Sequence, residues 1–298
     1  MSPDSTFSDT CDIPVTVADD WSGVTSSRKR RKIQNRLNQR AYRARNRHLK
    51  SSKQDGSREN LAATSLCQEL MNFRSGSGGS IRMSDLKRLM DTVCVLQVHS
   101  EHNKSALQAF EVFARHCSAN APPHLEFLPI LTQFHFTRAL FVNVDVMGLS
   151  QNQMHDDALS PFNITGPWDT AMAPKLDSLP LALRPTELQV TIPHHPWIDL
   201  LPLPQFRDNI LIALDNDLDE EALCQAFSGR TRSEPPGIIV WQDPWDPSGW
   251  EISEAFARSH GWLLKNCWAL FDSTNKWRAR RGERPLLPRR PSDVIQEV

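Results

Sequence analysis

The residues best suited to specific chemistry lie in one short polar stretch near the N-terminus. Residues 27–50 contain no glycine or proline and have a composition typical of a helix. On such a helix, three carboxamide side chains and the only tyrosine of the chain recur at spacings of three and four residues, so they share one face. Asn and Gln form paired hydrogen bonds with adenine in the DNA major groove. The residues that form this stripe are Asn35, Asn38 or Gln39, Tyr42 and Asn46.

A block of positive charge surrounds the stripe. Residues 28–50 contain eleven Lys and Arg and no Asp or Glu, whereas residues 51–298 hold 23 Lys and Arg against 30 Asp and Glu. A basic block on a mildly acidic body is typical of an arm that binds a polyanion. In such arms the cations neutralise phosphates and supply most of the affinity. The expected phosphate contacts or nuclear-import residues are Arg28, Lys29, Arg30, Arg31, Lys32, Arg36, Arg40, Arg45 and Arg47.

Two other interpretations of the basic block remain open on composition. The segment RKRRK at residues 28–32 would serve as a nuclear-import signal by itself. An arginine-rich helix of this kind also binds RNA in some proteins. The stripe of amides and one aromatic ring favours DNA, because a uniform cationic arm would lack groups that distinguish bases.

The pattern Asn35-x-x-Asn38-Gln39-x-x-Tyr42-Arg43 resembles the basic region of bZIP transcription factors, specifically the fungal Pap/Yap-like kind. That kind shows Asn, then Ala-Gln, then Phe-Arg at these spacings. The resemblance implies that Asn35 and Arg43 make the central contacts with DNA and that Gln39 and Tyr42 contact further bases. It also implies a location in the nucleus and double-stranded DNA as the partner. Asn38 departs from the pattern, because a polar amide replaces the methyl group that would meet a thymine.

A second departure from the bZIP pattern concerns dimerisation. In that family the basic helix continues directly into a leucine zipper, but polar residues and a glycine occupy the corresponding positions here, and none makes a coiled-coil seam. We therefore expect a homo- or heterodimer to form through another part of the chain or on DNA. The leucine positions would be Lys53, Asn60, Cys67 and Arg74, the other core positions Lys50, Ser57 and Thr64, and the glycine is Gly56.

The remaining sequence predicts a mostly α protein: a basic DNA-binding helix, a flexible linker, and an all-helical C-terminal domain with long proline-rich loops. Eight of the nine tryptophans lie between residues 168 and 277, which predicts an aromatic core in that half. The expected regions are a disordered acidic tail (1–20), the basic region (21–50), a linker with a vestigial or absent zipper (51–80), the helical domain (81–282) and a tail (283–298).

Several local patterns predict the elements of the helical domain. Apolar residues at helical spacing predict helices after a cap at Ser84 and around residues 107–117, and a further helix runs from Pro129 toward Gly148. Residues 151–204 are rich in proline and predict an irregular segment. The later elements are a helix from Pro204, a helix at 219–227, a short strand or extended loop at 238–241, and a helix after the capping-box spacing of Ser248 and Glu251.

Two C-terminal segments carry a further resemblance. RPTELQVTIPHHPWIDLLPLPQFRDNI (184–210) and VWQDPWDPSGWEISEAFARSHGWLL (240–264) are similar to a fungal domain of unknown function that recurs after such basic regions in bZIP-like regulators. The resemblance implies an all-helical partner domain in a transcription regulator. It supplies no catalytic residues.

Some residue pairs invite an enzymatic or metal-binding hypothesis. His194, His195 and Asp199 could hold a metal, but His195 with Asp199 is only a two-ligand set, so buried loop residues bonded to backbone are the favoured interpretation. Asp243 and Asp246 could form an acid/base pair, although aspartates around Pro-Trp are more often turn and cap residues.

The sequence otherwise favours a DNA-binding regulator over an enzyme. It contains no nucleophile elbow, phosphate-binding glycine loop or dinucleotide fingerprint, and its six cysteines are scattered. We expect no catalytic residue, no metal and no cofactor. No apolar run reaches about 18 residues, so we expect no membrane partner. The alternative is a helical enzyme or metal- or ligand-binding module whose basic block is only an import signal or a nonspecific nucleic-acid arm.

Overall fold

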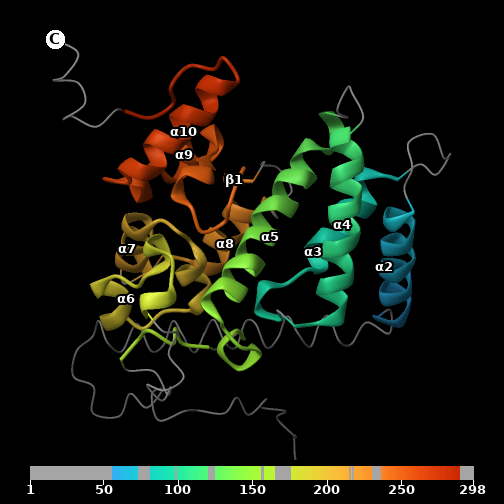
Figure 1. Ribbon diagram of the computed structural model, residues 1–298, viewed down its shortest axis with the longest axis horizontal. Helices are drawn as coiled ribbons and strands as arrows, with labels where there is room; N and C mark the ends of the chain where they lie inside the picture. The colour runs from blue at the N-terminus through green and yellow to red at the C-terminus, as the bar shows by residue number, and fades with distance from the viewer. Residues whose placement is uncertain are drawn as a thin grey trace, which may run out of the picture. The chain divides into compact units, whose positions relative to one another are not determined.

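The computed structural model describes residues 56–72, 81–97, 99–119, 125–155, 158–164, 176–214, 216, 218–229 and 236–288. The chain divides into two units, Met1–Arg58 and Glu59–Val298, and nearly all described residues belong to the second. This unit is mostly helical, as expected, with one two-stranded sheet among its described residues (Figure 1).

The helices are α2 (Gly56–Met71), α3 (Met83–Thr92), α4 (Glu101–Ala119), α5 (Leu128–Met147), α6 (Glu187–Thr191), α7 (Pro204–Leu214), α8 (Glu220–Ser228), α9 (Glu254–His260) and α10 (Trp268–Arg280). The strands are β1 (Ile238–Val240) and β2 (Trp250–Ile252), and the short 3-10 helices used below are η7 (Leu181–Leu183), η8 (Pro196–Leu200), η9 (Pro247–Gly249) and η10 (Gly261–Leu264).

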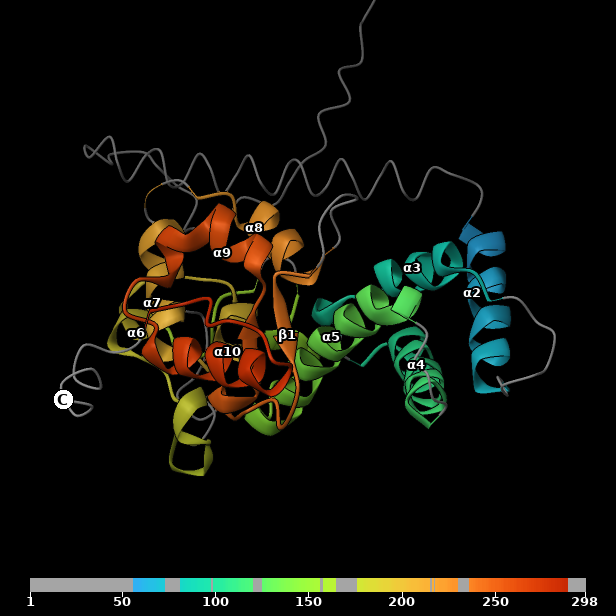
Figure 2. The same ribbon diagram turned by 90° about the horizontal axis from the view of Figure 1, so that it is seen from above.

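Helix α5 is the central element of the second unit. It contacts α3 and α4 on one side and α8, β1 and η8 on the other (Figures 1 and 2). Its buried residues occupy most of its circumference, which is the pattern of a helix covered on several sides. Pro129 lies in its first turn and Gly148, with φ of 67°, ends it in the left-handed region, so the predicted helix from Pro129 to Gly148 is confirmed.

Two predicted caps are wrong. Helix α3 begins at Met83 after Arg82, which makes no side-chain cap, so Ser84 is not its N-cap. Ser248 does not start a helix either, because Asp246 caps η9 and the chain then enters β2. Helix α9 begins only at Glu254, where the Ser253 side chain accepts from the backbone N–H of Phe256.

The predicted short strand is confirmed as β1. It pairs antiparallel with β2, and Ile238 lies opposite Ile252. The helices predicted from Pro204 and at 219–227 are present as α7 and α8. The proline-rich segment is less irregular than expected, because several 3-10 turns and α6 lie within its described part.

The structure also differs from the predicted linker and tail. Helix α2 occupies residues 56–71 of the predicted linker, and its Cys67 and Leu70 side chains are buried in the hydrophobic core of the unit. Near the other end of the chain, the Asn275 side chain of α10 accepts from the backbone N–H groups of Leu286 and Leu287. The described part of the predicted tail therefore packs against α10.

The core is aromatic, but phenylalanine supplies most of it. Phe227 contacts the rings of Phe136, Phe206 and Phe256, and it also meets Trp197. Among the tryptophans in the described part of the chain, only Trp197 and Trp250 are buried. The predicted aromatic core thus contains few of the tryptophans that suggested it, since Trp241, Trp245 and Trp262 are exposed. None of the described helices is both long enough and apolar enough to cross a membrane.

Candidate functional site

The residues predicted to contact DNA lie outside the part of the chain that the structure describes. These are the base contacts Asn35, Asn38, Gln39, Tyr42 and Arg43 and the phosphate or import residues Arg28, Lys29, Arg30, Arg31, Lys32, Arg36, Arg40, Arg45 and Arg47. The described residues nevertheless form two polar sites, one buried around the proline-rich segment and one at the surface of α10.

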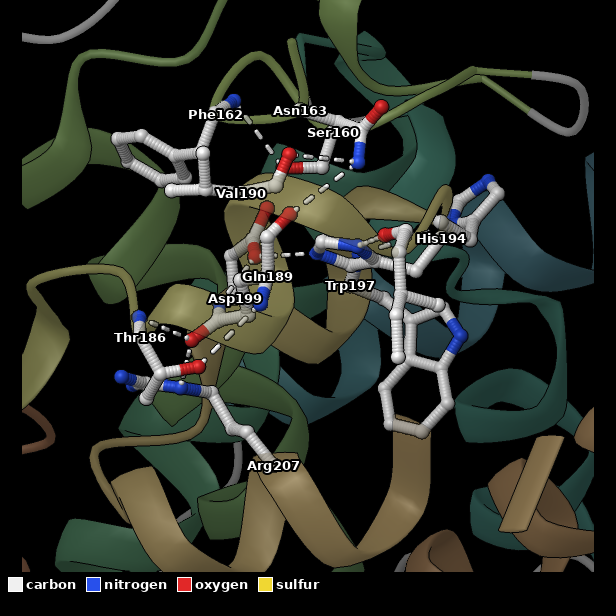
Figure 3. A network of polar contacts seen from close by, with 12 residues as sticks. Ser160, Phe162, Asn163, Thr186, Gln189, Val190, His194, Trp197, Asp199 and Arg207 are labelled. Atoms are coloured by element: carbon white, nitrogen blue, oxygen red, sulfur yellow. Dashed lines mark hydrogen bonds and ion pairs between the residues drawn. The ribbon is translucent and has the colours of Figure 1, made fainter. Parts of the chain in front are cut away.

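The buried site is centred on a histidine and an aspartate (Figure 3). His194 Nε2 lies 2.8 Å from Asp199 Oδ1, and both side chains are fully buried. His194 Nδ1 lies 2.7 Å from the backbone oxygen of Ile192. His195 has a different partner, since its Nε2 lies 2.7 Å from the backbone oxygen of His155. The pairing of His195 with Asp199 considered from the sequence is therefore wrong, and His194 is the partner.

The two contacts of His194 define its charge. Both ring nitrogens face oxygen acceptors, an arrangement that favours a ring with a proton on each nitrogen. Burial disfavours this charge and lowers the pKa of His194, but the Asp199 carboxylate and the Ile192 carbonyl outweigh burial and raise the pKa above its ordinary value. Asp199 Oδ2 is buried and has no hydrogen-bond donor among the described residues. The hydrogen bonds to Oδ1 must therefore offset the cost of burying the whole carboxylate.

Gln189 connects this pair to Arg207. Its Nε2 donates to Asp199 Oδ1 at 2.5 Å, and its Oε1 accepts from Arg207 Nε at 2.8 Å. The backbone N–H of Thr186 donates to the same Oε1 at 3.1 Å, and Thr186 and Gln189 together form the capping box at the start of α6. The amide orientation is fixed, because its NH₂ faces an anion and its oxygen faces two donors (Figure 3).

Arg207 joins two backbone segments, the end of η7 and the end of η8, to α7. Its side chain is fully buried, and its two Nη atoms donate at 2.6 to 2.8 Å to the backbone oxygens of Ala182, Arg184 and Leu201. Burial lowers the pKa of Arg207 to about 10, although the nearby carboxylates of Asp199 and Asp208 oppose this change. The guanidinium therefore stays charged at neutral pH. It fixes backbone groups that would otherwise lack donors.

The buried site fits a structural role, because its side chains are buried and most of their polar atoms contact other groups of the protein. The His194–Asp199 pair has the composition of a general base, yet neither nitrogen of the ring is free to accept a proton. Asn143 of α5 links this site to the loop around Pro244. Its Nδ2 donates to the backbone oxygens of Leu200 and Pro244 at 2.8 and 2.9 Å. Within the described ranges, no group of three or more His, Cys, Asp or Glu side chains could hold a metal ion.

The aspartates around Trp245 also serve local structure. The backbone N–H of Asp246 donates to the backbone oxygen of Asp243 at 3.0 Å. The Asp246 oxygens accept from the backbone N–H and the hydroxyl of Ser248, each at 2.8 Å. This geometry agrees with the turn-and-cap interpretation rather than with an acid/base pair.

The surface site is built on Glu251 of β2. Its side chain is only 3% exposed, and Arg281 holds it through two contacts of 2.9 and 2.5 Å. Trp241 Nε1 donates to the same carboxylate at 2.7 Å. Hydrogen bonds with Glu251 and Glu283 raise the pKa of Arg281, and the Arg281 hydrogen bond lowers the pKa of Glu283.

Sequence reasoning singled out His194 and Asp199 of the buried site but missed Arg207 and Gln189, and it missed the arginines of the surface site. Arg207 lies three and four positions before the buried Ile210 and Leu211, so an arginine on the apolar face of a predicted helix was the available signal for it. Gln189 gave a weaker signal as the third residue after Thr186. Residues 276–284 hold five Lys and Arg and one Glu, a second basic run that only a local charge count would reveal.

Comparison with known families gives one match. Residues 168–270 match DUF3425, described as a domain of unknown function, which is known from bZIP-type regulators. The match contains Gln189, His194, Asp199, Arg207 and Glu251 and ends within α10. Neither the curated proteins nor the solved structures contain a match to this chain.

Proposed function

We propose that this protein is a nuclear, sequence-specific DNA-binding regulator of transcription. The observation that carries the proposal is the stripe of Asn35, Gln39 and Tyr42 between cationic edges, with Arg43 beside it. In a helix lying in the major groove, the amides and Arg43 would bond to base edges, while the flanking cations would neutralise phosphates. The DUF3425 match supports the proposal, since that domain is known from bZIP-type regulators.

The helical domain would regulate or dimerise the DNA-binding arm. A zipper is the usual means by which two basic helices are joined. In this chain, Cys67 occupies a leucine position of the zipper register, and its side chain is buried in the core of its own domain together with Leu70. Cys67 and Leu70 of α2 thus pack within one chain, which supports a dimer contact on another surface of the helical domain.

The test uses full-length protein and two duplexes, one selected from a random pool and one with the same bases scrambled. Fluorescence anisotropy across a salt series gives affinity and its salt dependence. We expect Asn35→Ala to weaken binding to the selected duplex by roughly 1–3 kcal/mol and to leave the scrambled duplex nearly unchanged. Arg47→Ala is the control, because loss of a phosphate contact weakens both duplexes equally and lowers the salt slope.

The mass of the complex completes the test. Two chains on the selected duplex would support dimerisation, whereas one chain would assign a single basic helix to each half-site. If Asn35→Ala weakens both duplexes by the same factor, the stripe does not distinguish bases and the proposed sequence-specific function is wrong.

A further inference from the structure

The C-terminal end of α10 carries a second concentration of positive charge. Lys276, Arg280 and Arg284 are exposed, and none of them has an acidic partner among the described residues. Lys276 and Arg280 are four residues apart on α10 and therefore share a face. Arg278 Nε donates to the backbone oxygen of Arg284 at 2.8 Å, which holds that residue near the helix end. We call Lys276, Arg280 and Arg284 the α10 cations.

A pair of stacked tryptophans supports these cations. Lys276 Nζ and Arg280 Cζ lie 5.9 and 4.5 Å from the centre of the Trp277 ring. The Trp277 ring stacks on Trp241 at 5.3 Å with an angle of 20° between the planes. Trp277 Nε1 donates to the backbone oxygen of Ser248 at 2.8 Å, which fixes the ring against η9. Because the rings are fixed, they reduce the freedom that the two cations would lose on binding an anion.

Three nearby acidic residues contact other arginines. Glu251 and Glu283 both contact Arg281, and Glu283 also lies 3.2 Å from Arg278. Glu254 contacts Arg258. These pairs cancel charge locally, so the three α10 cations dominate the field at this end of the helix. They must act through their side chains, because the C-terminal end of a helix carries partial negative charge.

We propose that the α10 cations form a second DNA contact, which binds the phosphate backbone without distinguishing sequence. The inference rests on the proposed function and adds a surface to it. One basic helix without a zipper buries little surface for tight specific binding. A cationic edge on the folded domain would add affinity through phosphate neutralisation and would help to position the domain on the duplex.

The helical structure of this edge argues against an import signal as its role. Lys276, Arg278 and Arg280 are held in a helix, whereas a short import signal bound by a receptor must be available as a peptide. An anionic membrane would also attract an edge of cations and tryptophans. The membrane is therefore an arm of the test.

The test compares two triple variants of the full-length protein. Lys276→Gln, Arg280→Gln and Arg284→Gln together remove the α10 cations. The matched control removes the same charge from exposed cations of α3 and α4, through Arg88→Gln, Lys104→Gln and Arg115→Gln. Both are measured on the selected and scrambled duplexes across a salt series, and on vesicles of phosphatidylserine and phosphatidylcholine. Thermal unfolding checks that both variants are folded.

We expect the α10 variant to bind both duplexes roughly tenfold or more weakly, with the salt slope reduced by about 0.9 for each lost phosphate contact. Its preference for the selected duplex should remain, and the control should bind like the wild type. An α10 variant that matches the control on DNA overturns the inference, as does a loss confined to the vesicles. The single variant Arg280→Gln, with one third of the charge change, should show a smaller loss in the same direction.

The Asn35→Ala variant separates this inference from the proposed function. If neither the wild type nor Asn35→Ala prefers the selected duplex, but the α10 variant still lowers affinity and salt slope, then sequence-specific binding is wrong and the phosphate contact stands. If the preference depends on Asn35 and the α10 variant binds like the control, then the proposed function stands and the inference is wrong.

Discussion

Arg207 and Arg281 each bind several oxygens, but they do so in different surroundings. Arg207 is fully buried, and three of its acceptors are uncharged backbone oxygens. Arg281 is 33% exposed, and its partners are the carboxylates of Glu251 and Glu283. Burial lowers the pKa of Arg207 to about 10, whereas hydrogen bonds with the two carboxylates raise the pKa of Arg281.

The difference indicates which polar groups hold the fold and which remain available to a partner. Each of the three guanidinium nitrogens of Arg207 donates to a protein oxygen, so the loss of Arg207 would leave buried acceptors that water cannot easily reach. Arg281 instead neutralises the buried Glu251 and the exposed Glu283, and its neighbours Lys276 and Arg280 keep their charges exposed. The buried network is a scaffold, and the α10 end is a candidate contact surface.

The largest effect should follow replacement of the buried arginine. Arg207→Met keeps the length and apolar volume but leaves the oxygens of Ala182, Arg184 and Leu201 without their donor. We expect the free energy of unfolding to fall by about 5 kcal/mol, since each buried acceptor that loses its donor costs about 1–3 kcal/mol. Chemical denaturation followed by tryptophan fluorescence gives this value.

Arg281→Met is the matched comparison for that experiment. Glu251 would keep the hydrogen bond from Trp241 Nε1, and solvent can reach the vacated position, so we expect a loss of only about 1–2 kcal/mol. Equal losses in Arg207→Met and Arg281→Met would contradict the distinction between scaffold and surface.

Asp199→Asn tests whether the buried groups act as one unit. The substitution keeps the shape of the side chain but removes the charge that faces the His194 imidazolium. We expect the free energy of unfolding to fall by about 3 kcal/mol, the lower end of the range for breaking a buried ion pair. The double variant with Arg207→Met should lose less than the sum of the single variants, because Gln189 joins the two positions. Strict additivity in denaturant unfolding would show that the two positions are independent.

The sequence predicted the helical fold well because apolar spacing along one helix is a local property. Pro129 and Gly148 bracket α5, and Pro204 opens α7, as their conformational preferences require. The partners within the buried site could not be predicted, since Arg207 reaches residues up to 25 positions away only after the proline-rich segment has folded. The spacing of Ser248 and Glu251 misled for a related reason: pairing with β1 places Glu251 in a strand, opposite Ile239.

A pH series should reveal the charge on His194 through His194→Gln. The pKa of His194 is raised in the folded protein, so protonation stabilises the fold fully below the unfolded value of about 6.5. That contribution is lost as pH rises from 6.5 through the higher folded pKa. The stability difference between wild type and variant should therefore be larger at pH 5.5 than at pH 8.5.

Other titrating groups do not obscure this pH comparison. Burial lowers the pKa of His135, with a further contribution from Arg138, so that residue favours the folded state at higher pH instead. Because His135 is present in both proteins, its effect cancels in the difference. A difference that is flat from pH 5.5 to 8.5 would mean that His194 does not carry the added proton.

The smallest effect on stability should come from the α10 cations, although they should have the larger effect on DNA binding. Replacing Lys276, Arg280 and Arg284 with glutamine removes exposed charges with no acidic partner in the described part of the chain, and only two of them contact Trp277. We expect the free energy of unfolding to change by less than about 1 kcal/mol, since cation–π contacts at exposed sites contribute no more than that. A loss of several kcal/mol would make these residues part of the scaffold. A negligible loss would mean that folding does not require three aligned charges at this end of α10, which is the property expected of a surface used for binding.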